Sequence, residues 1–174
     1  YAHLPLILDP DRHKMSKRFS ATAVEEYRRQ GYLAEAMTNF MALLGWHSKN
    51  DREIFGRDDL IKEFDLGRVQ KAGAIFNLEK LDWLNYQYLK LLSDKELSGL
   101  LGVKNLKIIN LIRDRMRKLS DFKALSDWFF QVPDYPSELL IWKGAPKEKI
   151  RNNLQEAVRL LKTGKPALLT GLAD

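Results

Sequence analysis

The sequence contains no cysteine in its 174 residues. That absence excludes disulfide bonds, thiolate metal sites and a cysteine nucleophile, and it fits a reducing compartment. Long apolar runs are missing too. None approaches the roughly 20 residues of a membrane-spanning helix, and the first residues lack the basic segment and cleavage site of a signal peptide. We therefore predict a cytoplasmic protein without a membrane partner.

Histidine is scarce as well. His3, His13 and His47 are scattered along the chain and lack the spacing of metal ligands. We therefore expect no metal site in this segment, and in particular no zinc site.

Acidic residues are outnumbered by basic ones, so the chain carries a net charge of +6 and a pI near 9.4. The excess is concentrated, because residues 104–123 and 143–165 each hold seven lysines and arginines against two acidic residues. A basic helix face is usually only solvated. Two such windows nevertheless favour a polyanionic partner such as nucleic acid.

The chain begins at Tyr1 rather than at a methionine, and we interpret it as a segment of a longer protein. The apolar run from Leu4 to Leu8 predicts a short buried strand, which ends at the turn-forming Asp9-Pro10-Asp11. Residues 12–20 are polar and basic, which is typical of an exposed loop.

Two helices are expected after this loop. Thr22 and Glu25 have the spacing of a capping box, which predicts a helix to about Gln30 that ends at Gly31. A second helix is predicted over residues 33–44 and ends at Gly45. Its inward face should carry the residues that recur at spacings of three and four, namely Ala36, Met37, Phe40, Met41 and Leu44.

The middle of the chain predicts two more helices. Asp58 is expected to cap a short helix through Phe64, and Asn77 to start a longer one. The buried face of the longer helix should consist of Leu78, Leu81, Leu84, Tyr88, Leu91 and Leu92.

From residue 93 the chain reads as helical with hardly any strand signal. Ser93 and Glu96 form another capping box, and helices are expected at about 94–101, 104–118, 121–130 and 146–162. The predicted fold class is therefore mainly α, with a short N-terminal β element. We place a domain boundary near residue 93.

The tryptophans Trp46, Trp83, Trp128 and Trp142 are expected to be partly buried, with the indole nitrogen at the edge of the core. Trp128 stands beside Phe129 and Phe130, and this aromatic cluster is the best candidate for a base-stacking site.

The segment Lys14-Met15-Ser16-Lys17-Arg18 lies in the loop between the predicted strand and the first helix. Lysine ammonium groups on such a loop can close over a triphosphate, where charge builds on the leaving pyrophosphate during attack at the α-phosphate. Lysine suits this task as a compact charge on a long stem. Ser16 can hold the loop backbone or reach a phosphate oxygen.

These five residues match the KMSKS-type signature of class I aminoacyl-tRNA synthetases. The chain also resembles bacterial-type glutamyl-tRNA synthetases closely over residues 1 to about 90, in the segments 2–8, 31–36, 39–46, 51–55 and 76–85. Beyond residue 90, only the helical and basic character is similar to that family's anticodon-binding region.

The resemblance implies an ATP site and a catalytic role for the loop. Lys17 would be the principal ATP contact and Lys14 the second, with Met15, Ser16 and Arg18 completing the ATP-binding loop. The substrates would be ATP with Mg²⁺, L-glutamate held by a domain that these residues do not include, and tRNA(Glu), with tRNA(Gln) as a further possibility.

The same resemblance divides the chain into three segments. Residues 1–20 would end the catalytic domain, residues 21–92 would form the stem-contact domain, and residues 93–174 would begin the helical anticodon-binding region. The His-x-Gly-His signature of the nucleotide-binding fold is absent from the 174 residues, so we expect the segment alone to be inactive.

An RNA-binding surface is expected on the helical stretch from residue 104 to 118, whose apolar side (Ile108, Ile109, Ile112 and Met116) should be buried. Two alternatives remain open: a non-catalytic RNA-binding helical module with a synthetase-like body, and a helical interaction domain that uses the Trp128 cluster. The candidate RNA-binding residues are Lys104, Lys107, Arg113, Arg115, Arg117 and Lys118.

Overall fold

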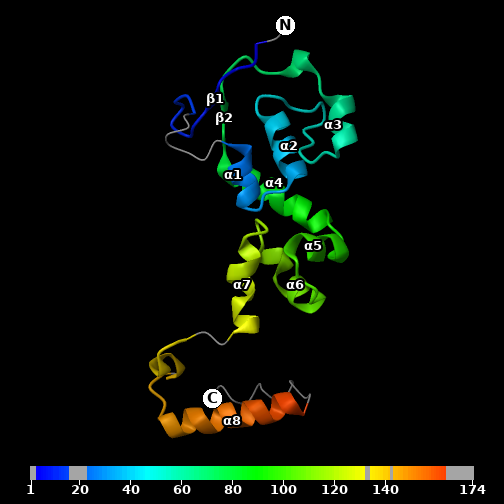
Figure 1. The fold of residues 1–174 in the computed structure, drawn as a ribbon. Coiled ribbons are helices and arrows are strands. Elements are labelled where there is room, and N and C mark those ends of the chain that lie inside the picture. The colour runs from blue at the N-terminus through cyan, green and yellow to red at the C-terminus, as the bar shows by residue number, and fades with distance from the viewer. Residues whose placement is uncertain (1–2, 16–22, 132–133, 142, 164–174) are drawn as a thin grey trace. The chain divides into compact units, whose positions relative to one another are not determined.

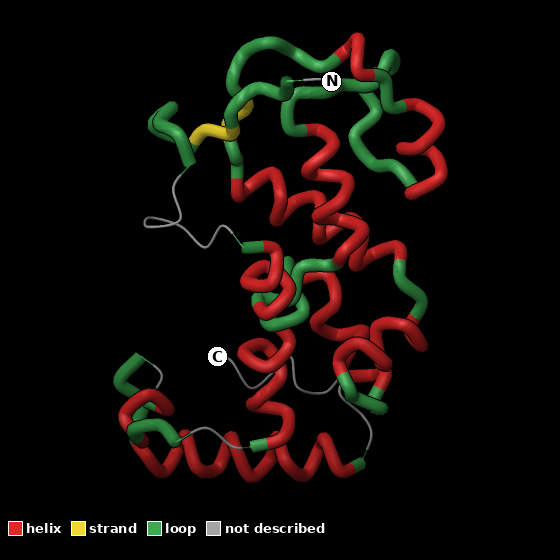
Figure 2. Tube along the Cα trace, turned by 45° about the horizontal axis from the view of Figure 1, so that its top comes forward, coloured by secondary structure: helices red, strands yellow, loops and turns green. Residues whose placement is uncertain are grey.

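The fold was analysed in a computed structural model, which describes residues 3–15, 23–131, 134–141 and 143–163. The chain divides into two compact units, Tyr1–Gln131 and Val132–Asp174 (Figure 1). Helices dominate the described residues (Figure 2), which confirms the predicted mainly α class. None of these helices is long and apolar enough to cross a membrane.

The β structure is smaller than predicted. Strand β1 (Ile7–Leu8) pairs in parallel with β2 (Ala74–Ile75), with Ile7 opposite Ala74. The predicted strand from Leu4 is therefore too long, because the pairing includes only Ile7 and Leu8, and the side chains of Leu4 and Leu6 are exposed. Gly73 lets this pair form, since a Cβ there would lie 2.6 Å from Leu8 Cδ1.

The first two helices lie close to their predicted positions. Helix α1 (Val24–Arg29) has Ala23 rather than Thr22 as its N-cap, without a side-chain cap, and Thr22 lies outside the described residues. Helix α2 (Ala34–Leu43) buries Ala36, Met37 and Phe40 as predicted. Met41 is exposed, so its assignment to the core was wrong.

Helix α3 (Arg57–Glu63) has Gly56 as its N-cap rather than the predicted Asp58, and the short 3₁₀ helix η1 (Leu66–Arg68) follows it. Helix α4 (Leu78–Leu91) begins as predicted, because the Asn77 side chain accepts a hydrogen bond from Lys80 N–H at 3.0 Å.

Two leucines of α4 were wrongly assigned to the core. Leu78 and Leu91 are exposed. Asn85 and Leu89, which were not predicted to face the core, are buried. The two exposed leucines occupy the first and last positions of the helix, where no neighbouring helix covers them among the described residues.

The capping box that starts α5 (Asp94–Leu101) is confirmed, because Ser93 and Glu96 satisfy each other's backbone N–H groups. Helix α7 (Asp121–Phe130) also has its predicted bounds. The single helix expected over residues 104–118 is wrong. It is divided into α6 (Leu106–Ile112), capped by Asn105, and the 3₁₀ helix η2 (Arg113–Arg115).

Three clusters of buried side chains hold the first unit together, and the smallest contains Trp46, Phe55 and Leu60. The two larger clusters share helices, because α2 packs on α4 and both helices contribute to each of them. The N-terminal core contains Tyr27, Tyr32, Met37, Phe40, Phe76, Leu81 and Leu84. The helical core contains Leu33, Ala36, Tyr88, Leu89, Leu97, Ile108, Ile109, Ile112, Met116 and Phe122, which confirms the predicted apolar side of residues 104–118.

The tryptophans differ in burial. Trp46 is 3% exposed, and its Nε1 has no hydrogen-bond partner among the described residues, so the predicted edge position was wrong for it. Trp83 is half-buried, and the exposed Trp128 donates from Nε1 to the Leu125 carbonyl at 2.7 Å. Trp142 lies outside the described residues.

The second unit contains the 3₁₀ helix η3 (Ser137–Leu140) and helix α8 (Lys147–Lys162). A groove of about 480 Å³ separates them, with an apolar lining that includes Ile141, Leu154 and Val158. The predicted bounds of the last helix, 146–162, agree with α8 to one residue, because Pro146 is its N-cap.

Candidate functional site: a signature turn and a basic surface

A tight turn presents the first half of the lysine signature. The Asp9 carboxylate accepts a hydrogen bond from His13 N–H at 2.8 Å, and Asp9 N–H donates to the His13 carbonyl at 2.9 Å. Arg12 adopts a left-handed conformation with φ of 65°, which closes the turn. This local hydrogen bonding agrees with the turn predicted from Asp9-Pro10-Asp11.

The returning chain then pairs with β1. Lys14 forms an antiparallel bridge with Leu8, and Met15 N–H donates to the Ile7 carbonyl at 3.1 Å. The Lys14 side chain is exposed, and the structure pairs it with no carboxylate in the described part of the chain. The backbone around Lys14 is fixed by these hydrogen bonds, and its ammonium group is accessible to a polyphosphate. Ser16, Lys17 and Arg18 lie outside the described residues.

The turn also brings together three groups that could act as metal ligands. Asp9, Asp11 and His13 offer ligand atoms that all lie within 4.8 Å of one another. The spacing of the histidines alone predicted no such group. Asp11 and His13 are exposed, and exposed acidic groups are common without an ion, so the group by itself defines no metal centre.

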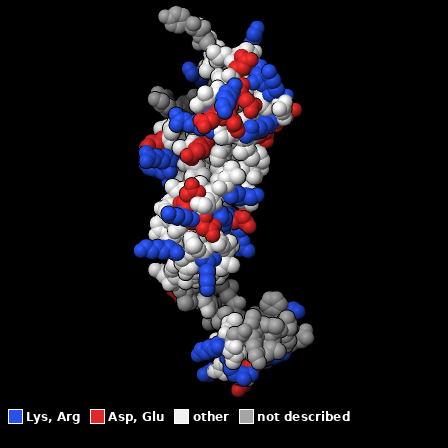
Figure 3. All heavy atoms as spheres, turned by 90° about the vertical axis from the view of Figure 1, so that its right-hand side faces the viewer, with Lys and Arg blue, Asp and Glu red and all other residues white. Residues whose placement is uncertain are grey.

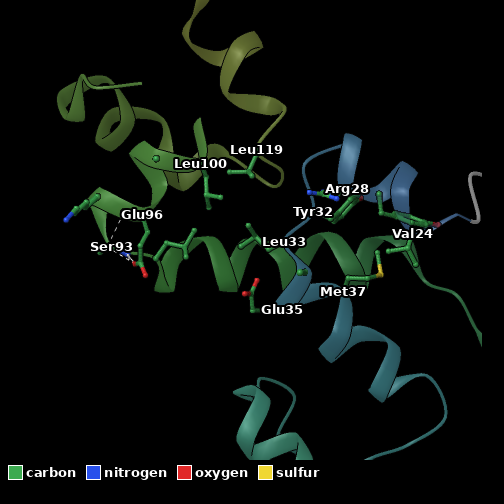
Figure 4. A pocket seen from close by; sticks show the side chains of 15 residues that line it. Val24, Arg28, Tyr32, Leu33, Glu35, Met37, Ser93, Glu96, Leu100 and Leu119 are labelled. Carbon is green, nitrogen blue, oxygen red and sulfur yellow. Dashed lines mark hydrogen bonds between the residues drawn. The ribbon is translucent and has the colours of Figure 1, made fainter. Parts of the chain in front are cut away.

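A wide groove lies elsewhere in the first unit. It is an open groove of about 1230 Å³ between the α1–α2 region and α5, and its floor includes Tyr32, Leu33 and Met37 (Figure 4). None of the residues predicted to bind ATP or RNA lines it. Its size therefore does not mark it as the site of the chemistry.

The predicted RNA-binding residues fall into two groups. Lys104, Lys107, Arg115 and Arg117 are exposed, and Lys118 is half-buried. On the face of the molecule shown in Figure 3, basic side chains are interspersed with acidic ones. Local geometry, rather than a uniform field over that face, therefore has to distinguish an RNA contact from ordinary solvation.

Arg113 has a structural task. Its side chain is 18% exposed, pairs with Asp94 at 2.9 Å and donates to the Leu92 carbonyl. These contacts tie the end of α6 to the start of α5. Because its guanidinium is already engaged, the functional proposal below rests on the other five cations.

Two neighbouring cations lie over tyrosine rings. The guanidinium carbon of Arg117 is 4.5 Å from the ring centroid of Tyr86, and Lys118 Nζ is 5.4 Å from that of Tyr32. Lys90 Nζ lies 5.2 Å from the same Tyr86 centroid. Tyr86 and Lys90 were not among the residues predicted to bind RNA, although their spacing of four residues on a predicted helix was a usable signal.

The Tyr32 side chain is also held in place at its hydroxyl group. It is 5% exposed, and its hydroxyl donates a hydrogen bond to the Asp82 carboxylate. Burial, followed by this hydrogen bond, raises the pKa of Tyr32 above its usual value, so the ring under Lys118 remains neutral.

Comparison with known families gives the class of protein. Residues 1–83 match the family described as tRNA synthetases class I (E and Q), catalytic domain. This segment includes the signature and the helices that follow it. Residues 1–83 therefore belong to the class I tRNA synthetases of the glutamate and glutamine type.

Within that class, the chain is a homologue of glutamate–tRNA ligases. It is 42% identical to the enzyme of Dehalococcoides mccartyi, with 90% of this chain and 36% of the relative covered. It is also 42% identical to that of Nitrosomonas europaea, with 80% and 33% covered. The chain thus spans about a third of the length of these curated relatives.

A solved structure agrees in fold. The glutamate tRNA ligase of Elizabethkingia meningosepticum, determined in complex with its amino acid, aligns with a TM-score of 0.71 and 35% identity. The alignment covers 91% of this chain and 38% of that one. These matches favour the synthetase interpretation over a non-catalytic RNA-binding module and over a helical interaction domain.

Proposed function

We propose that this chain is part of a glutamate–tRNA ligase, in which it supplies the ATP-gripping loop and a surface for tRNA. One observation carries the proposal: the signature from Lys14 to Arg18 follows β1 and the tight turn after it, inside the segment that matches the class I catalytic domain. The Lys14 backbone is anchored to Leu8, and its ammonium group is exposed toward solvent.

The proposed reaction begins with attack of a glutamate carboxylate oxygen on the α-phosphorus of ATP. A new oxygen–phosphorus bond forms, the bond to the bridging oxygen breaks, and pyrophosphate leaves. Lys17 stabilises the charge that develops on the leaving group, and Lys14 is the second cation. Mg²⁺ accompanies ATP and shields its phosphate charges. A hydroxyl oxygen of the terminal ribose of tRNA then attacks the glutamyl carbonyl carbon. The new ester bond forms as the bond from that carbon to the phosphate oxygen breaks, AMP leaves, and the hydroxyl proton passes to water.

The division of labour along the chain follows the family resemblance. Residues 1–20 end the catalytic domain, residues 21–92 contact the tRNA stem, and residues 93–174 begin the helical anticodon-binding region. The cations Lys104, Lys107, Arg115, Arg117 and Lys118 bind RNA phosphates. The partner is tRNA(Glu), and the proposed contacts would accept tRNA(Gln) equally, because phosphate contacts carry no sequence information.

Replacing Lys17 tests the proposed role of the loop. In a full-length enzyme carrying this segment, Lys17→Ala should slow glutamyl-adenylate formation by about 100-fold or more, because one transition-state charge contact is lost. The affinity for tRNA should change little. The rate is measured by ATP–pyrophosphate exchange and the affinity by filter binding.

Lys62→Ala is the matched control, since Lys62 is an exposed lysine on α3 that lies outside the signature. It should leave the exchange rate unchanged. Equal losses of exchange and of tRNA affinity in Lys17→Ala would contradict the role assigned to Lys17.

A further inference from the structure

Two cations from distant parts of the chain meet at the ring of Tyr86. Lys90 Nζ lies 5.2 Å and the Arg117 guanidinium carbon 4.5 Å from its centroid. Tyr86 and Lys90 are four residues apart on α4, so they share one helix face. Arg117 reaches the ring from the segment between η2 and α7.

Neither cation is neutralised in the described part of the chain. The structure gives no ion pair to Lys90 or to the Arg117 guanidinium, whereas Arg113 pairs with Asp94. Like charges that converge on one ring repel each other. The ring offsets part of that repulsion through cation–π attraction, and an anion that contacts both cations would offset the rest.

The Arg117 backbone is held rigidly on both sides. Its N–H donates to Asp121 Oδ2 at 2.8 Å, and its carbonyl accepts from Asn85 Nδ2 at 2.5 Å. Asn85 is fully buried and also accepts from Leu33 N–H at 2.8 Å. Because Asn85 precedes Tyr86 on α4, this bond fixes Arg117 to the helix that carries Lys90. The site is preorganised before any ligand arrives.

We propose that Lys90 and Arg117, held at the ring of Tyr86, form a binding site for a phosphodiester group of the RNA backbone. Arginine offers a planar fork that fits phosphate oxygens, and lysine adds a compact charge. Lys118, over the neighbouring Tyr32, continues the basic surface. The inference rests on the proposed tRNA-binding function and adds Lys90 and Tyr86 to it.

The number of phosphate contacts can be measured by salt titration. Binding of the 174-residue chain to a tRNA(Glu) transcript is followed by fluorescence anisotropy between 50 and 200 mM salt, for wild type, Lys90→Gln, Arg117→Gln and Lys62→Gln. Each lost contact should reduce the slope of log K against log salt by roughly 0.7 to 0.9. The fall in affinity across this range then becomes roughly threefold smaller.

The control and the double variant separate the outcomes. Lys62→Gln removes an exposed lysine in the last turn of α3, to which no phosphate contact is assigned, and should keep the wild-type slope. The double variant Lys90→Gln with Arg117→Gln should lose less affinity than the two single losses combined, because both side chains bind one phosphate.

Replacing the ring distinguishes positioning from folding. Tyr86→Phe keeps the ring and should keep the wild-type slope, whereas Tyr86→Leu should lower it while thermal unfolding stays cooperative. If Lys90→Gln behaves as Lys62→Gln does, the Tyr86 site is refuted and the wider RNA surface stands. If wild type itself shows no salt-dependent binding, the proposed RNA-binding function fails together with this site.

Discussion

Two asparagines are completely buried in the first unit, and each replaces a missing backbone partner. Asn39 donates from Nδ2 to the Glu53 carbonyl at 2.8 Å, and its Oδ1 accepts from Phe55 N–H. Asn85 likewise donates from Nδ2 to the Arg117 carbonyl, and its Oδ1 accepts from Leu33 N–H. A buried amide is tolerated only when its donors and acceptors are satisfied, so these residues fix which segments lie side by side.

Such long-range bridges were beyond the reach of sequence reasoning. Helical periodicity puts position 85 on the buried side of α4, but a polar asparagine at that position does not by itself predict a buried residue. Its partners lie 52 and 32 residues away. Local spacing carries no information on contacts of that separation.

Tyr32 supplies a prediction at the scale of one residue. Tyr32→Phe removes the hydrogen bond to Asp82 and should lower the free energy of unfolding at pH 7 by about 1 kcal/mol. The pKa of Tyr32 is raised in the folded state, so its contribution to stability is fully present below the ordinary tyrosine pKa. Above about pH 10 the unfolded state loses this proton first, and stability falls.

Urea unfolding between pH 7 and 11 measures this effect. The difference in the free energy of unfolding between wild type and Tyr32→Phe should narrow as the pH rises above 10. Tyr86→Phe, which breaks no hydrogen bond among the described residues, should match wild type at pH 7. A constant gap for Tyr32→Phe would show that the hydroxyl proton is not held by the fold.

Among the elements, the starts of α4 and α5 were predicted correctly because their signals are local. The Ser93 capping box and the Asn77 cap each involve side chains within three residues. The strand from Leu4 was overextended because a strand needs a neighbour. Only Ile7 and Leu8 have one, and it arrives from β2.

The break between α6 and η2 has the same kind of origin. Residues 104–118 have a continuous helical pattern, and all four predicted apolar positions are buried. The α-helix nevertheless ends at Ile112, where the Arg113 side chain reaches back to Leu92 and Asp94. A tertiary contact thus overrides the local propensity.

The capping box of α5 gives a prediction at the scale of one helix. Ser93→Ala removes the acceptor for Glu96 N–H and should lower the free energy of unfolding by about 1 kcal/mol. Ser93→Asn keeps a side-chain acceptor at the N-cap and should cost only a few tenths of a kcal/mol. Chemical denaturation measures both, and equal losses would contradict the capping role.

At the scale of the whole molecule, the sequence carries one of the two signatures expected of a class I synthetase, the lysine signature from Lys14 to Arg18. The 174 residues contain no His-x-Gly-His sequence. We expect this chain alone to show no ATP–pyrophosphate exchange with glutamate. Exchange by the isolated chain would overturn the assignment of the remaining contacts to another domain.

The candidate site was predicted only in part, because some of its residues come together only in the folded molecule. The signature is contiguous, so its five residues stand out in the sequence. The Tyr86 site is assembled from residues 86, 90 and 117, and only the first two share a helix. Composition located the basic window, and the fold shows which of its cations are already engaged, as Arg113 is.

Helix α4 has a further consequence for how the first unit unfolds. Its first half lies in the N-terminal core through Leu81 and Leu84, and its second half lies in the helical core through Tyr88 and Leu89. Unfolding of either cluster removes the packing from one half of α4, and this destabilises the other half and the cluster that it belongs to. A functional boundary near residue 93 therefore need not be a boundary of cooperativity, and the segments on both sides of it should lose hydrogen-exchange protection in a single step.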